Sequence, residues 1–176
     1  MRLLRQLPNL VSFARILLTP LVVMAILARD ERAAVYWAAA ACVTDAIDGE
    51  LARLFHWRSR LGAYLDPIAD KILLSAVYIA FGVTGVIPWW LVAMVFFRDI
   101  LILLAAGLAL VFTGMRPFAP SIWGKISTCF QMATAMVALI HKDWLPALIW
   151  ATAAATLWSG LHYAWREAGM LRKAAT

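Results

Sequence analysis

Long apolar segments, separated by short stretches of charged residues, prolines or glycines, constrain this chain more than any other feature. Of its 176 residues 64% are hydrophobic and 15% are charged, whereas soluble domains average about 45–50% apolar and about 25% charged residues. The mean hydropathy is +0.81. Because a helix of ~20 residues crosses the ~30 Å apolar core of a bilayer, the pattern predicts an all-α polytopic membrane protein.

Six segments are long and apolar enough to be transmembrane helices. They cover approximately 10–28, 33–53, 61–84, 88–113, 121–140 and 145–165. We interpret 1–176 as a single membrane domain whose first helix is retained rather than cleaved as a signal peptide, because Arg15 interrupts its apolar run. Cys42 and Cys129 lie inside apolar runs without a metal-binding spacing, so we expect small core residues there.

The distribution of basic residues predicts the orientation of these helices. The loops 29–32, 85–88 and 141–143 together carry three basic and three acidic residues, whereas the other thirteen Lys and Arg residues lie toward the opposite side. Both termini and the loops 54–60 and 114–120 are therefore expected to be cytoplasmic. A net charge of +6 concentrated there favours anionic lipids and phosphates as partners. Nucleic acid is excluded, since there is no basic soluble domain.

Four aspartates inside the second and third predicted helices carry the strongest functional signal, because carboxylates within a membrane are costly and mark functional sites. Asp45 and Asp48 are three residues apart and Asp66 and Asp70 four apart, so each pair shares one helix face. If the two helices are antiparallel, Asp48 and Asp66 lie level, ~7 Å from the connecting loop. Asp45 and Asp70 lie level at ~12–14 Å.

Four neighbouring carboxylates require compensation. Two unit charges 4 Å apart repel by about 4 kcal/mol at an effective dielectric constant of 20. The four carboxylates must therefore be partly protonated, paired with cations or bound to metal. A cluster of oxygen ligands suits Mg²⁺ or Mn²⁺. His56, in the following loop, is expected to be a surface residue, and no cysteine lies in the pattern to suggest zinc.

The motif DxxDGxxAR, followed by eight residues and GxxxDxxxD, is present with every fixed position matched. The chain thereby resembles the CDP-alcohol phosphotransferase family. Eight specified residues at fixed spacing make the resemblance specific, and six helices agree with it. The matching residues are Asp45, Asp48, Gly49, Ala52, Arg53, Gly62, Asp66 and Asp70.

The resemblance implies transfer of a phosphatidyl group from CDP-diacylglycerol to an alcohol with release of CMP, in a bacterial-type inner membrane and at a site open to the cytoplasm. It implies that the four aspartates bind one or two Mg²⁺ or Mn²⁺ ions, with Asp70 also the candidate catalytic base. It further implies that Gly49, Ala52, Arg53 and Gly62 surround the CDP moiety. Membrane lipids are expected partners, and family members are commonly homodimers.

Later segments are expected to select the acceptor alcohol, with Arg98, Arg116 and Lys125 as candidate binding residues. The segments 8–15 and 120–128 resemble bacterial phosphatidylglycerophosphate synthases, which favours glycerol 3-phosphate. The Arg98-Asp99 step departs from that subfamily and is similar to cardiolipin synthases, so phosphatidylglycerol is the alternative acceptor. Inositol phosphate, serine and choline remain open.

Two hypotheses from other classes compete with the transferase. Acids inside a membrane also mark ion paths, so a cation or proton transporter would explain the aspartates. It would need polar groups that continue beyond Asp45 and Asp70, and none follow on those two helices. A membrane scaffold without catalysis would leave four buried charges unused, which is costly.

Overall fold

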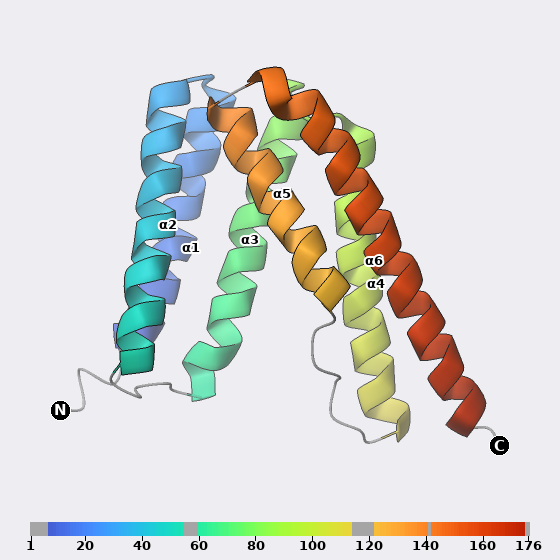
Figure 1. Ribbon diagram of the computed structural model, residues 1–176. Helices are drawn as coiled ribbons and strands as arrows, with labels where there is room; N and C mark the ends of the chain where they lie inside the picture. Colours follow the sequence, from blue (N-terminus) through green and yellow to red (C-terminus); the bar gives the residue numbers. More distant parts are fainter. Residues whose placement is uncertain (1–6, 55–59, 114–121, 141, 175–176) are drawn as a thin grey trace. The chain divides into compact units, whose positions relative to one another are not determined.

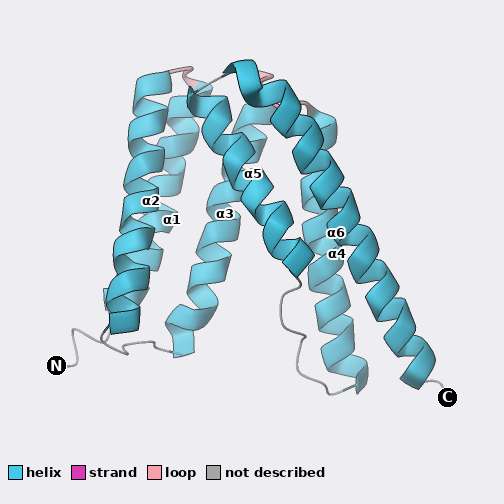
Figure 2. Cartoon of the chain, in the orientation of Figure 1, coloured by secondary structure: helices cyan, strands magenta, loops and turns pink. Residues whose placement is uncertain are grey.

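The structure, a computed structural model, describes residues 7–54, 60–113, 122–140 and 142–174, with side chains over 15–44, 70–104, 122–140 and 143–165. These ranges contain six α-helices, a short 3-10 helix and no strand (Figure 1, Figure 2), which confirms the predicted all-α class. Within the described part of the chain, none of the helices combines the length and the apolar character that crossing a membrane requires. The elements are α1 Leu7–Leu27, α2 Glu31–Leu54, α3 Arg60–Thr84, α4 Trp89–Thr113, α5 Ile122–Ile140, η2 Lys142–Trp144 and α6 Leu145–Ala174.

The helix bounds agree with the sequence prediction except at the end of α6. That helix ends at Ala174, whereas the prediction ended it near Trp165. The prediction applied a length suited to an apolar span and stopped where charged residues begin. The segment beyond Trp165 is rich in Ala, Leu, Met, Glu, Arg and Lys, which are strong helix formers whether or not they are apolar.

The chain divides into two compact units, Met1–Val86 and Ile87–Thr176. In the first unit α1 contacts both α2 and α3. Figure 1 shows that α2 and α3 run in opposite directions within this unit. Apolar side chains from all three helices are buried, among them Val22, Ile26, Ala34, Ala41, Val77, Tyr78 and Phe81.

The ends of α1 and α3 are closed in the same way. Arg29 (φ 57°), two residues after α1 ends, and Gly85 (φ 76°), the residue after α3, adopt the left-handed conformation. The amide that follows reaches back to a carbonyl of the last turn, from Asp30 to Ala25 (3.0 Å) and from Val86 to Phe81 (2.9 Å). These are Schellman caps, in which the left-handed residue frees the backbone to satisfy otherwise unpaired carbonyls.

The connection between α1 and α2 also fixes the start of α2. The Asp30 carboxylate accepts a hydrogen bond from the Ala33 amide at 3.0 Å, which is the usual role of an aspartate before a helix. The Arg29 guanidinium donates to the Thr84 carbonyl at 3.2 Å. The turn after α1 and the last carbonyls of α3 are therefore held together at one end of the first unit.

In the second unit α6 contacts α4, α5 and η2. Leu91, Val92 and Val95 of α4 are buried. About half of the described buried positions of α5 and α6 carry hydroxyl or amide side chains, which lie on one face of each helix. These are Ser127, Gln131 and Thr134 of α5, and Thr152, Thr156 and Ser159 of α6.

The expectation that both cysteines are core residues is wrong. Cys42 on α2 and Cys129 on α5 are exposed. An apolar run covers every face of its helix, so position within the run does not tell which residues face a neighbouring helix. Val43, next to Cys42, is likewise 55% exposed.

Candidate active site

The helices that carry the four aspartates place them in two levels. Asp48 lies six residues before α2 ends at Leu54, and Asp66 lies six residues after α3 begins at Arg60. Asp45 and Asp70 lie nine and ten residues from the same ends. The helices are antiparallel and rise 1.5 Å per residue, so the separations along the two helices match in pairs, and the pairing of the carboxylates remains a prediction. The side chains of Asp45, Asp48 and Asp66 lie outside the described residues.

Asp70 is the described member of this set, and it forms an ion pair with Arg15 of α1. The Arg15 Nη1 atom donates to the Asp70 Oδ1 atom across 55 positions of sequence. The arginine side chain is 3% exposed and the aspartate side chain 42% exposed. Because α1 contacts α3, the buried Arg15 guanidinium lies within the interface between these helices. The Asp70 carboxylate that it binds remains partly exposed.

Arg15 was not among the residues that sequence reasoning assigned to the site. A single cation within an apolar helix was the available signal, because such residues in transmembrane segments usually pair with another polar group. The sequence could not name the partner. The hydroxyl of Thr19, one turn further along α1, donates to the Arg15 carbonyl at 2.9 Å, so it contacts the arginine backbone rather than the ion pair.

The residues expected around the CDP moiety remain predictions. Gly49, Ala52 and Arg53 lie in the last turns of α2, and Gly62 lies in the first turn of α3. Their helical positions place them toward the same ends as Asp48 and Asp66. Their side-chain surroundings lie outside the described residues, and so does His56.

The candidate acceptor residues differ from one another in environment. The Lys125 side chain, in the first turn of α5, is exposed. Arg98, in α4, is buried, with 6% of its surface exposed. Arg116 lies outside the described residues. The acceptor role of all three remains a prediction.

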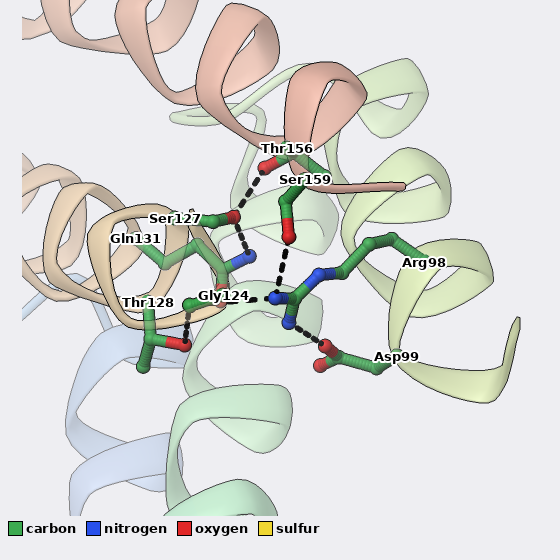
Figure 3. A network of polar contacts seen from close by, with 8 residues as sticks. All are labelled: Arg98, Asp99, Gly124, Ser127, Thr128, Gln131, Thr156 and Ser159. Atoms are coloured by element: carbon green, nitrogen blue, oxygen red, sulfur yellow. Dashed lines mark hydrogen bonds and ion pairs between the residues drawn. The ribbon is translucent and has the colours of Figure 1, made fainter. Parts of the chain in front are cut away.

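Arg98 is the centre of a polar network in the second unit (Figure 3). Its Nη1 atom donates to the Asp99 carboxylate at 2.8 Å. Its Nη2 atom donates to the Ser159 hydroxyl at 2.9 Å and to the Gly124 carbonyl at 3.3 Å. One guanidinium thus connects α4, α5 and α6 through its two Nη atoms, whereas its buried Nε atom has no hydrogen-bond partner among the described residues.

The network continues along the contact between α5 and α6. The Ser127 hydroxyl lies 3.2 Å from that of Thr156 and accepts from the Gln131 amide at 3.4 Å. Further along, the Thr134 and Thr152 hydroxyls are 2.6 Å apart. Small polar residues allow close helix contact and hydrogen bonds between helices. The buried Ser, Gln and Thr side chains of α5 and α6 form a polar stripe that the sequence analysis did not identify. Its signal in the sequence was the repeat of these residue types at three- and four-residue spacing.

The donor set fits a divalent cation by its chemistry. All four candidate ligands are carboxylates, which are the hard oxygen ligands that Mg²⁺ and Mn²⁺ favour. They come from two antiparallel helices at matching separations from the connection. Among the described side chains no group of three or more His, Cys, Asp or Glu residues is close enough to hold a metal ion; three of the four aspartates are not among those side chains.

Comparison with known proteins identifies one family. Residues 5–158 match the family model described as CDP-alcohol phosphatidyltransferase. The match includes α1 through α5 and the first half of α6, and it covers both aspartate pairs, Arg15 and the Arg98 network except Ser159.

The individual relatives carry two kinds of name. A Mycobacterium tuberculosis protein named "Putative cardiolipin synthase" is 33% identical over 166 residues, which are 90% of this chain and 77% of the relative. A second protein of that species, named "Probable phosphatidylglycerophosphate synthase", is 31% identical over 136 residues, or 74% and 63% of the two chains. A Drosophila melanogaster protein named "Probable cardiolipin synthase (CMP-forming)" is 30% identical over 154 residues, and the match spans only 48% of its length.

Proposed function

Since this chain belongs to the CDP-alcohol phosphatidyltransferase family, we propose that it transfers the phosphatidyl group of CDP-diacylglycerol to an alcohol and releases CMP. The observation that carries the proposal is the position of the acidic motif on α2 and α3. Two aspartates from each helix lie at matching separations from the helix ends. Asp70, the last of them, is fixed to α1 through Arg15 and remains partly exposed.

The transfer exchanges one phosphorus–oxygen bond for another. The acceptor hydroxyl oxygen bonds to the phosphorus that carries diacylglycerol, and the bond from that phosphorus to the CMP oxygen breaks. Asp70 takes the hydroxyl proton, a role in which a positioned carboxylate accelerates reactions by about 10²–10⁴-fold. Arg53 binds a phosphate oxygen of the CDP group, while Gly49, Ala52 and Gly62 leave room for the nucleotide.

Asp45, Asp48, Asp66 and Asp70 are the residues that hold Mg²⁺ or Mn²⁺ in this proposal. A divalent ion bound there would supply positive charge to the pyrophosphate and to the departing CMP. The choice of carboxylates over histidine or cysteine supports a hard cation.

The setting of the reaction is part of the proposal. CDP-diacylglycerol is a lipid, so the enzyme must reach it at a bilayer. We assign the chain to a bacterial-type inner membrane, as a single domain with six spans. Both termini and the site then lie on the cytoplasmic side. The sequence supports this through its apolar segments. The described helices support it through exposed large apolar side chains, such as Leu103 (71%), Trp150 (69%) and Leu161 (67%). A homodimer is the expected assembly.

Glycerol 3-phosphate is the proposed acceptor. It carries a phosphate dianion and therefore needs a cationic partner, and the exposed ammonium group of Lys125 is available for that role. Arg116 is the second candidate. The two buried Nη atoms of Arg98 already donate within the protein, which makes this arginine the weakest of the three candidates for contact with the phosphate.

Phosphatidylglycerol is the second candidate acceptor, which would make the chain a cardiolipin synthase. Two observations favour it. The Arg98-Asp99 step is similar to that subfamily, and a relative named as a cardiolipin synthase matches 90% of this chain, whereas one named as a phosphatidylglycerophosphate synthase matches 74%.

The test uses purified protein in detergent or nanodiscs, with CDP-diacylglycerol, Mg²⁺ or Mn²⁺ and one acceptor at a time. CMP is quantified and the lipid product is identified by mass spectrometry. We expect phosphatidylglycerophosphate from glycerol 3-phosphate, and loss of CMP release in Asp66→Asn and Asp70→Asn. Asp143→Asn, which alters an exposed aspartate on η2, is the matched control and should retain activity.

Each contrary result has a distinct meaning. Full CMP release by Asp66→Asn and Asp70→Asn would overturn the assignment of the site. Cardiolipin formation with phosphatidylglycerol as the sole productive acceptor would overturn glycerol 3-phosphate and establish the second candidate. Absence of CMP release with every acceptor would overturn the transferase itself.

A further inference from the structure

Arg15 is buried so thoroughly that its charge must be balanced within the protein. Its side chain is 3% exposed, and an arginine taken out of water is tolerated when an opposite charge and hydrogen bonds compensate it. The Asp70 carboxylate provides that charge. Arg15 lies on α1 and Asp70 on α3, so the pair is made by packing between helices and not by neighbours along one helix.

The aspartate in this pair has a second task. In the proposed function, on which this inference rests, Asp70 is a metal ligand and the base for the acceptor hydroxyl. Its side chain is 42% exposed, so the carboxylate is held by a buried group on one side and remains accessible on another. A guanidinium that donates to a metal-binding carboxylate has two effects: it orients the carboxylate, and its positive charge opposes the approach of a cation.

We propose that Arg15 is a positioning residue for the phosphatidyl transfer, which orients Asp70 and competes electrostatically with the divalent ion for it. With no metal bound, Arg15 balances the charge of Asp70 and stabilises the aspartate set. With metal bound, the remaining attraction between the two groups keeps the carboxylate in the direction that the reaction needs.

When the Arg15 charge is removed, the two effects predict opposite changes in metal affinity and in turnover. Arg15→Met retains an unbranched side chain of similar reach without the guanidinium. Metal binding should become tighter, because the competing cation is gone, whereas turnover should fall, because Asp70 is no longer oriented. Removing a group that orients a metal ligand typically costs about 10–100-fold in metal affinity or activity, and we expect that cost here in turnover. A residue that only supports the fold would lower stability and leave the metal affinity of the folded fraction unchanged.

The experiment titrates the full-length protein in nanodiscs with Mn²⁺ and measures free Mn²⁺ by electron paramagnetic resonance, so that binding is read without substrate. We expect Arg15→Met to bind Mn²⁺ about tenfold more tightly than the original protein, because a neighbouring arginine lowers the affinity of a carboxylate for a cation. We expect it to release CMP about 10–100-fold more slowly at saturating metal. Arg15→Lys keeps the charge, and its Mn²⁺ affinity should remain within about threefold of the original.

The matched control is Thr19→Val. It removes a buried hydroxyl one turn away on the same helix, where it bonds to the Arg15 carbonyl, and leaves the ion pair in place. Its Mn²⁺ affinity should not change. If Arg15→Met does not fold, Arg15→Gln removes the same charge with a polar side chain, and the same tightening is expected of it.

Unchanged or weaker Mn²⁺ binding by the charge-removing variant would overturn the inference. An equal increase in the Mn²⁺ affinity of Thr19→Val would also overturn it. These results are distinct from failure of the proposed function. If the original protein binds Mn²⁺ and Arg15→Met binds it more tightly, but no acceptor yields CMP, the role of Arg15 toward the metal stands and the transferase is wrong. If the protein does not bind Mn²⁺ at all, the metal site and this inference are both overturned.

Discussion

Two buried arginines, each paired with an aspartate, have different surroundings in the two units of the chain. Arg98 pairs with Asp99, its neighbour in sequence, and also donates to Ser159 and Gly124. The Asp99 side chain is 13% exposed. Arg15 pairs with an aspartate 55 positions away whose side chain is 42% exposed. The first arrangement encloses its charges, whereas the second presents one of them to the outside.

The difference in exposure between the two aspartates distinguishes an ion pair that holds helices together from one that can take part in chemistry. An enclosed pair with additional hydrogen bonds fixes the positions of helices and gives ligands little access. A pair with an exposed carboxylate retains a group that can exchange partners with a proton or a cation. The comparison therefore supports the proposed site in the first unit and a structural role for the Arg98 network that joins α4, α5 and α6.

The largest expected effect comes from replacing the arginine-paired aspartate of each unit, Asp70 or Asp99, with asparagine. Asp70→Asn should reduce CMP release by about 10²–10⁴-fold, because it removes the carboxylate proposed as base and as metal ligand. Asp99→Asn should leave the rate per folded molecule within about tenfold and act mainly on stability. Rates are measured by CMP release and normalised to folded protein. Equal losses in the two variants would abolish the distinction between the pairs.

The next largest effect concerns stability. Arg98→Met should lower the free energy of unfolding by about 3–5 kcal/mol, because it leaves the Asp99 charge without its buried partner. Unfolding is followed in mixed micelles by circular dichroism. The control is Arg29→Met, which removes an exposed arginine with a single bond to the Thr84 carbonyl and should cost no more than about 1 kcal/mol. A similar loss in both variants would contradict the central role of Arg98.

A smaller effect tests the stripe between α5 and α6. Thr152→Val leaves the buried Thr134 hydroxyl without one of its partners and should cost about 1–3 kcal/mol. In the double variant Thr134→Val, Thr152→Val both hydroxyls are replaced, so the total loss should be less than the sum of the single losses. The unfolding free energies of the four proteins form a double-mutant cycle. Strict additivity would show that the two hydroxyls do not interact.

The smallest effect is expected at the cap of α3, the helix that carries Asp70. Gly85 has φ +76°, and an added Cβ atom would meet no heavy atom within 4 Å. Gly85→Ala should therefore cost about 1–2 kcal/mol through backbone conformation alone. CMP release at a temperature well below unfolding should be unchanged. A large loss of activity would indicate that the site depends on the end of α3, and not mainly on the pair with Arg15.

The helices were predictable because the signals for them are local. Apolar runs and breaks at Gly85 and Pro88 set the bounds of five helices to within three residues. The spacing of Asp45 and Asp48, three positions apart on one helix, needs only the period of an α-helix. The end of α6 was misplaced because the prediction applied a membrane length to a segment whose helix-forming residues continue to Ala174.

The identity of partners was not predictable in the same way. Arg15 was visible as a lone cation in an apolar segment, but any acid of the chain was an eligible partner. The two exposed cysteines show the same limit, because hydropathy does not tell which face of a helix meets a neighbour. The buried Ser, Gln and Thr stripe of α5 and α6 became recognisable once both helices were seen in contact.

By itself, the sequence determined the all-α class, the approximate helix bounds, the acidic motif and, through that motif, the family. These follow from interactions between residues a few positions apart and from residue types at fixed spacing. Tertiary structure alone decided that Arg15 belongs to Asp70, that Arg98 joins three helices and that the cysteines face outward. Such pairings depend on which faces of distant helices pack together, and the free energy of that packing is a property of the whole folded chain.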